Sequence, residues 1–187
     1  MTKPKKIILG LAGQIASGKD TIADYLVKKY HGEKISFSQP FRDIMQRIQI
    51  PINRINLSRL GNDLRRAFGK DFLSKVIAQD VINSRAKIIT LPNIRLEEDL
   101  IHLKKIPGFY LVAVDADART RFDRLKKRKQ QYEDDKTKTW QQFQRDARLY
   151  TERHIRGIME KAPYRLDNNG TFKELYSQIE DLIKKLK

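Results

Sequence analysis

The sequence has no cysteine among its 187 residues, so it can form neither a disulfide nor a thiolate metal site. Chains without cysteine suit a reducing compartment, and we expect this protein in the cytoplasm. No apolar run approaches about 18 residues, so we expect no membrane span. The short apolar run after the basic start continues into Gly13 and Lys19 without a small-residue cleavage site. We interpret it as a buried strand rather than a signal peptide.

Acidic residues are comparatively few: 23 Asp and Glu stand against 39 Lys and Arg, for a formal net charge of +16. Such an excess points to polyanionic partners, namely nucleotides, nucleic acid or an anionic surface, although basic side chains also simply keep a surface soluble. Aromatic residues are not interleaved with the basic clusters as a single-strand-binding face requires. A sequence-specific nucleic-acid role is therefore not supported.

Short apolar segments alternate with helical patterns, and no repeat, low-complexity segment or linker interrupts them. We expect buried strands at residues 6–11, 34–37, 86–91, 109–114 and 164–166. We expect helices at residues 19–30, 40–48, 58–84 (two, separated near residue 69), 96–105, 117–130, from 139 onward and from 172 onward. This alternation predicts one α/β domain over residues 1–187, with a parallel five-stranded sheet and helices on both faces.

Local signals mark several ends of these segments. Thr139 with Gln142, and Thr171 with Glu174, have the spacing of capping boxes and predict helix starts. Pro92 is expected to end the third strand, because proline cannot donate to a strand ladder.

The most specific motif is G-x-x-x-x-G-K, which follows the first predicted strand and opens the first helix. That context is the one a phosphate-binding loop requires. Glycines let backbone amides approach a phosphate, and successive amides at the positive end of a helix form an anion-binding nest. The lysine adds a full charge that can reach the β- and γ-phosphates. The residues predicted to bind the nucleotide here are Gly13, Gln14, Ile15, Ala16, Ser17, Gly18, Lys19, Asp20 and Thr21.

Asp20 stands where this loop normally has a serine or threonine that binds magnesium through its hydroxyl. A carboxylate is a hard oxygen ligand, and Mg²⁺ accepts one or two beside phosphate oxygens and water. The competing interpretation is a first-turn acid that stabilises the helix dipole. An unneutralised carboxylate would repel a triphosphate, so we favour Asp20 as a metal ligand, with the Thr21 hydroxyl directed toward the inner phosphates.

Two later segments carry a family resemblance together with this loop: RFDRLKKRKQQYEDD, which starts at Arg121, and LDNNGT at 166–171. In this order they resemble P-loop nucleoside monophosphate kinases. The similarity is greatest to the branch near dephospho-CoA kinase, phage deoxynucleoside monophosphate kinases and archaeal adenylate-kinase-like proteins. The resemblance covers nearly the whole chain and implies a three-layer P-loop NTPase fold with a small helical lid at about 121–145. It also implies ATP and Mg²⁺ as cofactors.

The resemblance assigns roles to residues of both segments. Arg124 and Arg128, four residues apart in the lid segment, would clamp the donor phosphates and act with Lys19 in catalysis. Asn168, Asn169 and Gly170, with Thr171, match a late loop that packs near the adenine. Taken alone, the arginine pair is typical of a solvated face, and NNGT before a helix is simply a loop with an N-cap.

The family places its acceptor between the second and third strands, here a helical region at about 38–84. Arg42 and Arg65 are our candidates for binding an acceptor phosphate, because a planar guanidinium binds it bidentately. Ser36 adds a hydroxyl at the strand end. Arg95 matches the arginine of a D-G-I-R pattern whose aspartate is replaced here by Pro92. The loss of that aspartate implies a weak enzyme, a relocated metal site or nucleotide binding without transfer.

The predicted function is therefore ATP-dependent phosphoryl transfer to a small phosphorylated acceptor, with a nucleoside or deoxynucleoside monophosphate favoured. One alternative is dephospho-CoA kinase, whose acceptor is a sugar hydroxyl. Another is a nucleotide-binding regulatory or RNA-associated protein with little turnover, which Pro92 and the net charge would fit. Small-molecule nucleotides are the expected partners, and no motif indicates an oligomeric state.

Overall fold

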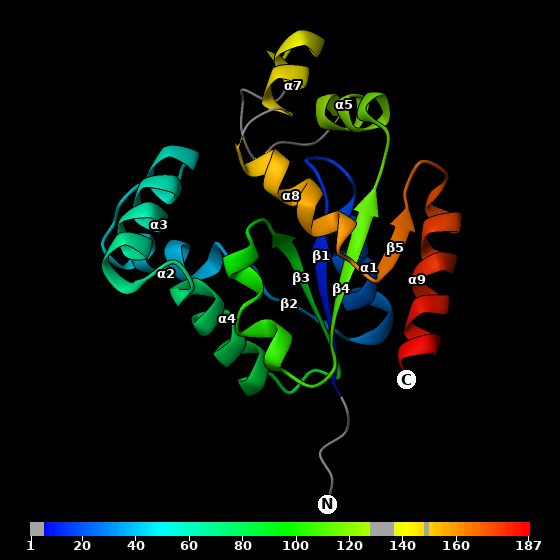
Figure 1. Cartoon of the computed structure of the whole chain (residues 1–187), viewed down its shortest axis with the longest axis horizontal. Helices are drawn as coiled ribbons and strands as arrows, with labels where there is room; N and C mark the ends of the chain where they lie inside the picture. The colour runs from blue at the N-terminus through cyan, green and yellow to red at the C-terminus, as the bar shows by residue number, and fades with distance from the viewer. Residues whose placement is uncertain (1–5, 128–136, 148–149) are drawn as a thin grey trace, which may run out of the picture.

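The computed structural model describes residues 6–127, 137–147 and 150–187, and a five-stranded sheet with all neighbours parallel forms its centre (Figure 1). The strand order is β2-β3-β1-β4-β5, so β1 lies between β3 and β4. The carboxyl end of β1 is thus a topological switch point, where open α/β sheets bind ligands. The strands are β1 (Ile7–Ala12), β2 (Glu33–Lys34), β3 (Ile88–Ile94), β4 (Phe109–Asp115) and β5 (Tyr164–Asp167).

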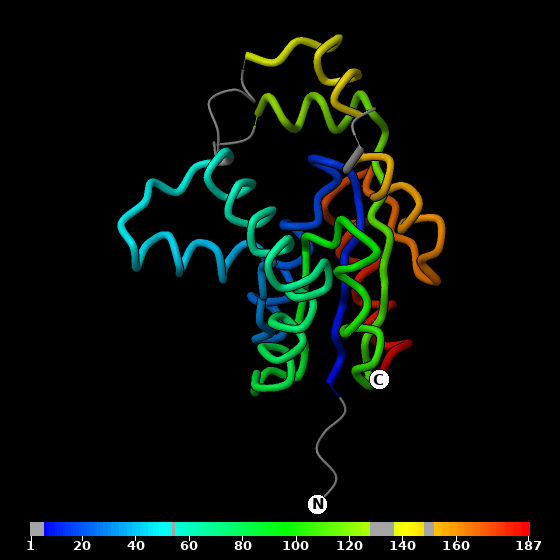
Figure 2. The backbone as a smooth tube through the Cα atoms, turned by 60° about the vertical axis from the view of Figure 1, so that its left-hand side comes forward, coloured from blue at the N-terminus to red at the C-terminus, as the bar shows by residue number. Residues whose placement is uncertain are grey.

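Helices cover both faces of the sheet, as Figures 1 and 2 show. Within the described ranges, no helix is long and apolar enough to cross a membrane. The α-helices are α1 (Lys19–Tyr30), α2 (Gln39–Arg47), α3 (Arg54–Phe68), α4 (Phe72–Asn83), α5 (Ala118–Lys127), α7 (Trp140–Asp146), α8 (Tyr150–Glu160) and α9 (Phe172–Leu186). Two 3₁₀ helices, η1 (Glu97–Leu100) and η2 (Leu103–Lys105), precede β4.

The burial of β1 on both faces shows why the sheet lies between two layers of helices. All six residues of β1 are buried, and successive side chains point to opposite faces of the sheet. Ile8 packs in the core formed with α4 and α8, whereas Leu9 and Leu11 pack in the core formed with α1 and α9. Because both faces are covered, the strand is continuously apolar rather than alternating.

The third strand differs from the prediction. Pro92 does not end β3, which continues to Ile94. The pairing of β1 with β3 shifts register between Gly10, opposite Leu91, and Ala12, opposite Ile94. Three residues of β3 therefore match two of β1, and Pro92 lies in this bulge. A bulge leaves the ladder locally unpaired, which is why it tolerates a residue without an N–H.

Two other segments are shorter than predicted. The second strand contains only Glu33 and Lys34, although the N–H of Ile35 still donates to the carbonyl of Thr90 at 2.9 Å. The helix expected at 96–105 is replaced by η1 and η2.

The local start signals are confirmed where the structure describes them. Both capping boxes are formed, the first at Thr139 before α7 and the second at Thr171 before α9. The predicted lid is described in part, as α5 and α7, which pack together through Phe122, Leu125 and Phe143. Residues 128–136 lie outside the described ranges. The predicted acceptor region contains α2, α3 and α4, and α2 and α3 project to one side of the sheet (Figure 1).

Gly108, directly before β4, is packed closely against the residue that precedes β1. Its φ is 86°, and a β-carbon built on it would lie 2.0 Å from the carbonyl oxygen of Lys6. We expect Gly108→Ala to lower the free energy of unfolding by about 2 kcal/mol or more, because both the backbone conformation and the overlap are unfavourable. Urea denaturation measures this change.

Gly157→Ala in α8 is the matched control, since no described heavy atom lies within 4 Å of its built β-carbon. It should leave stability unchanged or raise it by up to about 1 kcal/mol. Equal stability of the two variants would contradict the assigned packing at Gly108.

Candidate functional site

The loop between β1 and α1 forms the centre of the candidate site. Two of its residues have left-handed backbone conformations, Ala16 with φ of 60° and Gly18 with φ of 99°. Gly18 is the N-cap of α1, so the loop lies at the positive end of a helix of 12 residues. A β-carbon on Gly18 would also lie 2.1 Å from Nδ2 of Asn168, so a side chain is excluded there for two reasons. This geometry suits the binding of an anion by backbone amides.

Lys19 directs its ammonium group back onto the loop. Its Nζ donates to the carbonyls of Gly13 at 2.6 Å and Gln14 at 3.0 Å, and lies 3.4 Å from Oγ of Ser17. All three partners belong to the loop, so the positive charge is concentrated where the backbone amides gather. The residues present therefore fit a polyphosphate group.

Asn168 attaches the end of β5 to this loop. Its side chain is only 3% exposed, and its Nδ2 donates to the carbonyl of Ser17 at 2.8 Å. Its backbone N–H donates to the carbonyl of Asp115 at 2.8 Å. The adjacent Asn169 and Gly170 are exposed, and Oδ1 of Asn169 accepts from the N–H of Asp117. The geometry of Asn168 is that of a residue that positions the loop.

Arg124 reaches the same place from α5. Its Nη2 donates to Oδ1 of Asn168 at 3.4 Å. Its Nη1 is buried and has no hydrogen-bond partner among the described residues. Burial lowers the pKa of Arg124 from its usual value. A buried guanidinium nitrogen of this kind is an available donor for an oxyanion. Arg128, the second predicted clamp, lies outside the described residues.

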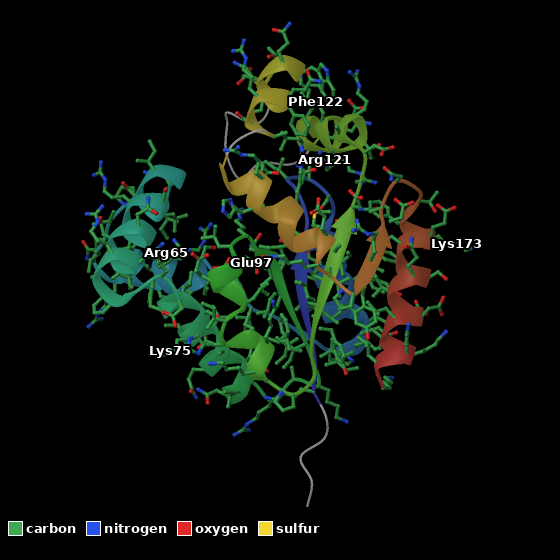
Figure 3. The ribbon with its side chains drawn as sticks, viewed as in Figure 1. Arg65, Lys75, Glu97, Arg121, Phe122 and Lys173 are labelled. Carbon is green, nitrogen blue, oxygen red and sulfur yellow. The ribbon has the colours of Figure 1, made fainter. Side chains whose placement is uncertain are left out.

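Arg121 was not selected from the sequence, yet it is one of the most buried charged residues, with 3% exposure. Its Nε donates to the carbonyl of Ala116 at 2.9 Å and its Nη1 to the carbonyl of Ile15 at 3.4 Å. Its guanidinium carbon lies 5.4 Å from the centre of the Phe143 ring. Burial, the largest effect, lowers its pKa. Figure 3 shows Arg121 on the sheet side of α5, so it links the lid helices to the loop.

A weak signal for Arg121 was present in the sequence. It lies four residues before Leu125 and next to Phe122, which makes it part of the buried face of α5. A charged residue at such a position needs partners for its donors, and here backbone carbonyls supply them.

Asp20 forms an ion pair with Lys34, with Oδ1 2.9 Å from Nζ. The same Nζ lies 3.0 Å from Oδ1 of Asp24. Among the described residues, no group of three or more His, Cys, Asp or Glu could hold a metal. One carboxylate with the neighbouring Thr21 hydroxyl fits Mg²⁺, which takes its other ligands from phosphate and water.

The predicted acceptor residues come from separate elements. Ser36 follows β2 and lies 3.0 Å from Ser38, oxygen to oxygen. Arg42 on α2 and Arg65 on α3 are half-buried, and Nε of Arg65 is buried without a partner among the described residues. Arg95 follows β3 with an exposed side chain. Ser36 and Arg95 thus lie at the carboxyl edge of the sheet, whereas the other two lie on the projecting helices, as Figure 3 shows for Arg65.

Asp99 is a buried carboxylate that the sequence did not single out. It is 5% exposed, and its Oδ2 accepts from the N–H groups of Arg95 and Leu96 at 3.0 Å. Burial raises its pKa, although these two hydrogen bonds and the nearby Arg65 oppose the shift. Asp99 therefore holds the turn after β3 in place.

A surface hollow of about 510 Å³ lies on α3, and none of the predicted site residues lines it. It is lined by Ile55, Ser58, Arg59, Asn62, Asp63 and Arg66.

No family model matches the chain. It is similar over most of its length to proteins named UPF0200. One from Methanococcus maripaludis is 25% identical over 183 residues, covering 96% of this chain and 97% of that protein. One from Sulfurisphaera tokodaii is 26% identical over 180 residues, covering 96% and 97%.

Solved structures show the same fold at lower identity. Shikimate kinase from Bacteroides thetaiotaomicron superposes with a TM-score of 0.64 at 14% identity, covering 96% of this chain and 98% of that one. Shikimate kinase from Acinetobacter baumannii in complex with shikimate gives 0.55 at 14% identity, covering 98% and 94%. The predicted parallel α/β fold of P-loop kinases is therefore confirmed.

The hydrogen bonds of Asn168 lead to a stability prediction. Asn168→Ala should lower the free energy of unfolding by about 1–3 kcal/mol, because the carbonyl of Ser17 loses its buried donor. Asn62→Ala, at an exposed position of α3, should change stability by less than about 0.5 kcal/mol. Thermal and urea unfolding measure both, and an equally small effect of the two changes would refute the positioning role of Asn168.

Proposed function

We propose that this protein is an ATP-dependent phosphotransferase that acts on a small phosphorylated acceptor, with a nucleoside or deoxynucleoside monophosphate favoured. One observation carries this proposal: Asn168 bonds both the phosphate loop and Arg124. Arg124 of α5 is thereby held at the N-terminus of α1, where Lys19 bonds the same loop. The fold shared with the shikimate kinases supports the same class of chemistry.

Phosphoryl transfer depends on positioning and charge stabilisation rather than on covalent steps by the protein. The loop amides would bind the donor phosphates, and Lys19 would neutralise their outer oxygens. Arg124 would add a donor from the opposite side. When bound, Mg²⁺ would supply further charge neutralisation, and Asp20 with Thr21 would hold it.

The acceptor is the less constrained part of the proposal. Half-buried arginines on α2 and α3 suit an anionic acceptor, because a guanidinium binds phosphate or carboxylate through two donors. The buried Nε of Arg65, which has no hydrogen-bond partner among the described residues, supports this assignment. Dephospho-CoA, which carries phosphates and accepts through a hydroxyl, and shikimate, a carboxylate, are therefore the comparison acceptors.

The lid is packed against the phosphate loop. Ile15 and Ala16 of the loop contact the cluster of Phe122, Leu125 and Phe143. A lid connected in this way can exclude water when both substrates are bound, which prevents loss of the phosphate to hydrolysis.

Turnover with a panel of acceptors tests the proposal. ADP formation from magnesium-ATP would be measured with nucleoside and deoxynucleoside monophosphates, dephospho-CoA and shikimate. We expect turnover with one nucleotide acceptor, and a loss of about 100-fold or more in Lys19→Ala, because a charge that stabilises the transition state is removed. Lys127→Ala, an exposed residue of α5, is the control and should keep full activity.

ATP binding without acceptor-dependent turnover would overturn the kinase proposal. The nucleotide-binding regulatory or RNA-associated alternative would then be favoured. Retention of RNA at high salt would support that alternative, because simple phosphate contacts weaken steeply as salt rises.

The metal assignment has its own test. Asp20→Ala should raise the magnesium concentration needed for half-maximal turnover roughly tenfold, because the charged oxygen ligand is lost and no hydroxyl replaces it. Asp24→Ala is the matched control: it lies one helical turn away and also contacts Lys34. Titration of Mg²⁺ at fixed ATP measures both. An unchanged magnesium requirement in Asp20→Ala would count against a role for Asp20 in metal binding.

A further inference from the structure

Lys34 connects the second strand to the helix that follows the phosphate loop. Its Nζ lies 2.9 Å from Oδ1 of Asp20 and 3.0 Å from Oδ1 of Asp24. The two aspartates are four residues apart on α1 and so share one face of the helix. The backbone of Lys34 is held by pairing with Thr90 of β3. The lysine is therefore placed by the sheet, independently of the helix that carries its partners.

The carboxylate of Asp20 creates an electrostatic problem for a loop that binds phosphate. A serine or threonine at this position is neutral, whereas Asp20 adds a negative charge beside a polyphosphate that is itself multiply negative. Repulsion between such charges a few Å apart is substantial even at a high effective dielectric constant. A fixed positive charge next to the carboxylate removes most of this repulsion.

We propose that Lys34 neutralises Asp20 and so allows the phosphate loop to bind a nucleotide polyphosphate before Mg²⁺ is present. This inference rests on the nucleotide site of the proposed function. It makes Lys34 a positioning and charge-compensating residue whose effect depends on Asp20. A loop with a neutral residue at position 20 would have no need of it.

The environment of Lys34 agrees with this role. Its side chain is 30% exposed, so the ion pair is partly shielded from water. Burial alone would lower the pKa of Lys34, but hydrogen bonds to Asp20 and Asp24 raise it above its usual value, so the group stays charged. Such a partly exposed ion pair adds little to folding stability. Its main effect is therefore expected on nucleotide binding.

Asp24 completes the arrangement. It gives Lys34 a second partner 3.0 Å away, one turn farther from the loop. Asp24 would therefore keep the ammonium group in place if Asp20 were to hold a metal ion. In this arrangement Mg²⁺ could replace Lys34 as the charge that neutralises Asp20, without any movement of β2.

A double-mutant cycle on ATP affinity tests this inference without measuring activity. Isothermal titration calorimetry would compare the unaltered protein with Lys34→Met, Asp20→Ser and the double variant, first in EDTA and then in excess Mg²⁺. In EDTA, Lys34→Met should weaken ATP binding about tenfold, whereas Asp20→Ser should not weaken it. In the Asp20→Ser background, Lys34→Met should have no further effect. In Mg²⁺, the effect of Lys34→Met should fall below about twofold.

Two controls separate local from general effects. Lys28→Met removes the same charge from an exposed position of α1 and should leave ATP affinity within about twofold. Lys34→Arg keeps the charge and should retain affinity. Thermal unfolding establishes that each variant is folded, and Lys34→Gln replaces Lys34→Met if the latter is not.

Each other outcome overturns the inference. An equal loss in the Asp20→Ser background would mean that Lys34 contacts the nucleotide directly. No loss in EDTA would mean that the ion pair is structural only. An equal loss in Lys28→Met would mean that overall charge is responsible. Absence of ATP binding by the unaltered protein in both conditions would refute the nucleotide site itself, and the inference with it.

Discussion

The hydrogen bond from Asn168 to the carbonyl of Ser17 is the constraint on which the rest of the site depends. It joins the end of β5 to the loop after β1 and requires Gly18 to have no side chain. Through its other amide atom, Asn168 also places Arg124 beside the loop. One buried side chain thus fixes the loop, a glycine and an arginine relative to one another, and a buried amide is well suited to this because both its ends can be satisfied.

The charges around the loop are distributed in an unusual way. A carboxylate occupies the hydroxyl position at Asp20, and Pro92, inside β3, stands where the resembled family has an aspartate. Lys34 faces the first of these from a neighbouring strand. After β3, the buried carboxylate of Asp99 accepts hydrogen bonds from the backbone of its own turn and so stabilises that turn. The positive charge of the site therefore comes from several elements, namely the start of α1, β2 and α5.

Helices α5 and α7 and the loop between β1 and α1 form one packed unit in the described part of the chain. Arg121 donates to a loop carbonyl, and its guanidinium carbon lies over the Phe143 ring of α7. The loop residues Ile15 and Ala16 contact the same aromatic cluster. A movement of α7 would therefore displace the loop, because packed side chains and buried hydrogen bonds transmit displacement. Arg42 and Arg65, the residues proposed to bind the acceptor, lie on α2 and α3, which project from the sheet (Figure 1).

The sequence by itself determined the features that depend on neighbouring residues. Capping boxes at Thr139 and Thr171, the phosphate loop and the buried parallel strands all follow from spacings of a few residues. What the tertiary structure decided involves distant partners: Asn168 and Ser17 are 151 residues apart. The burial of Arg121, the pairing of Lys34 with Asp20 and the bulge that keeps Pro92 inside β3 likewise depend on which strands become neighbours. A local pattern encodes hydrogen bonds within one helical turn, but strand order and register arise only when the whole sheet assembles.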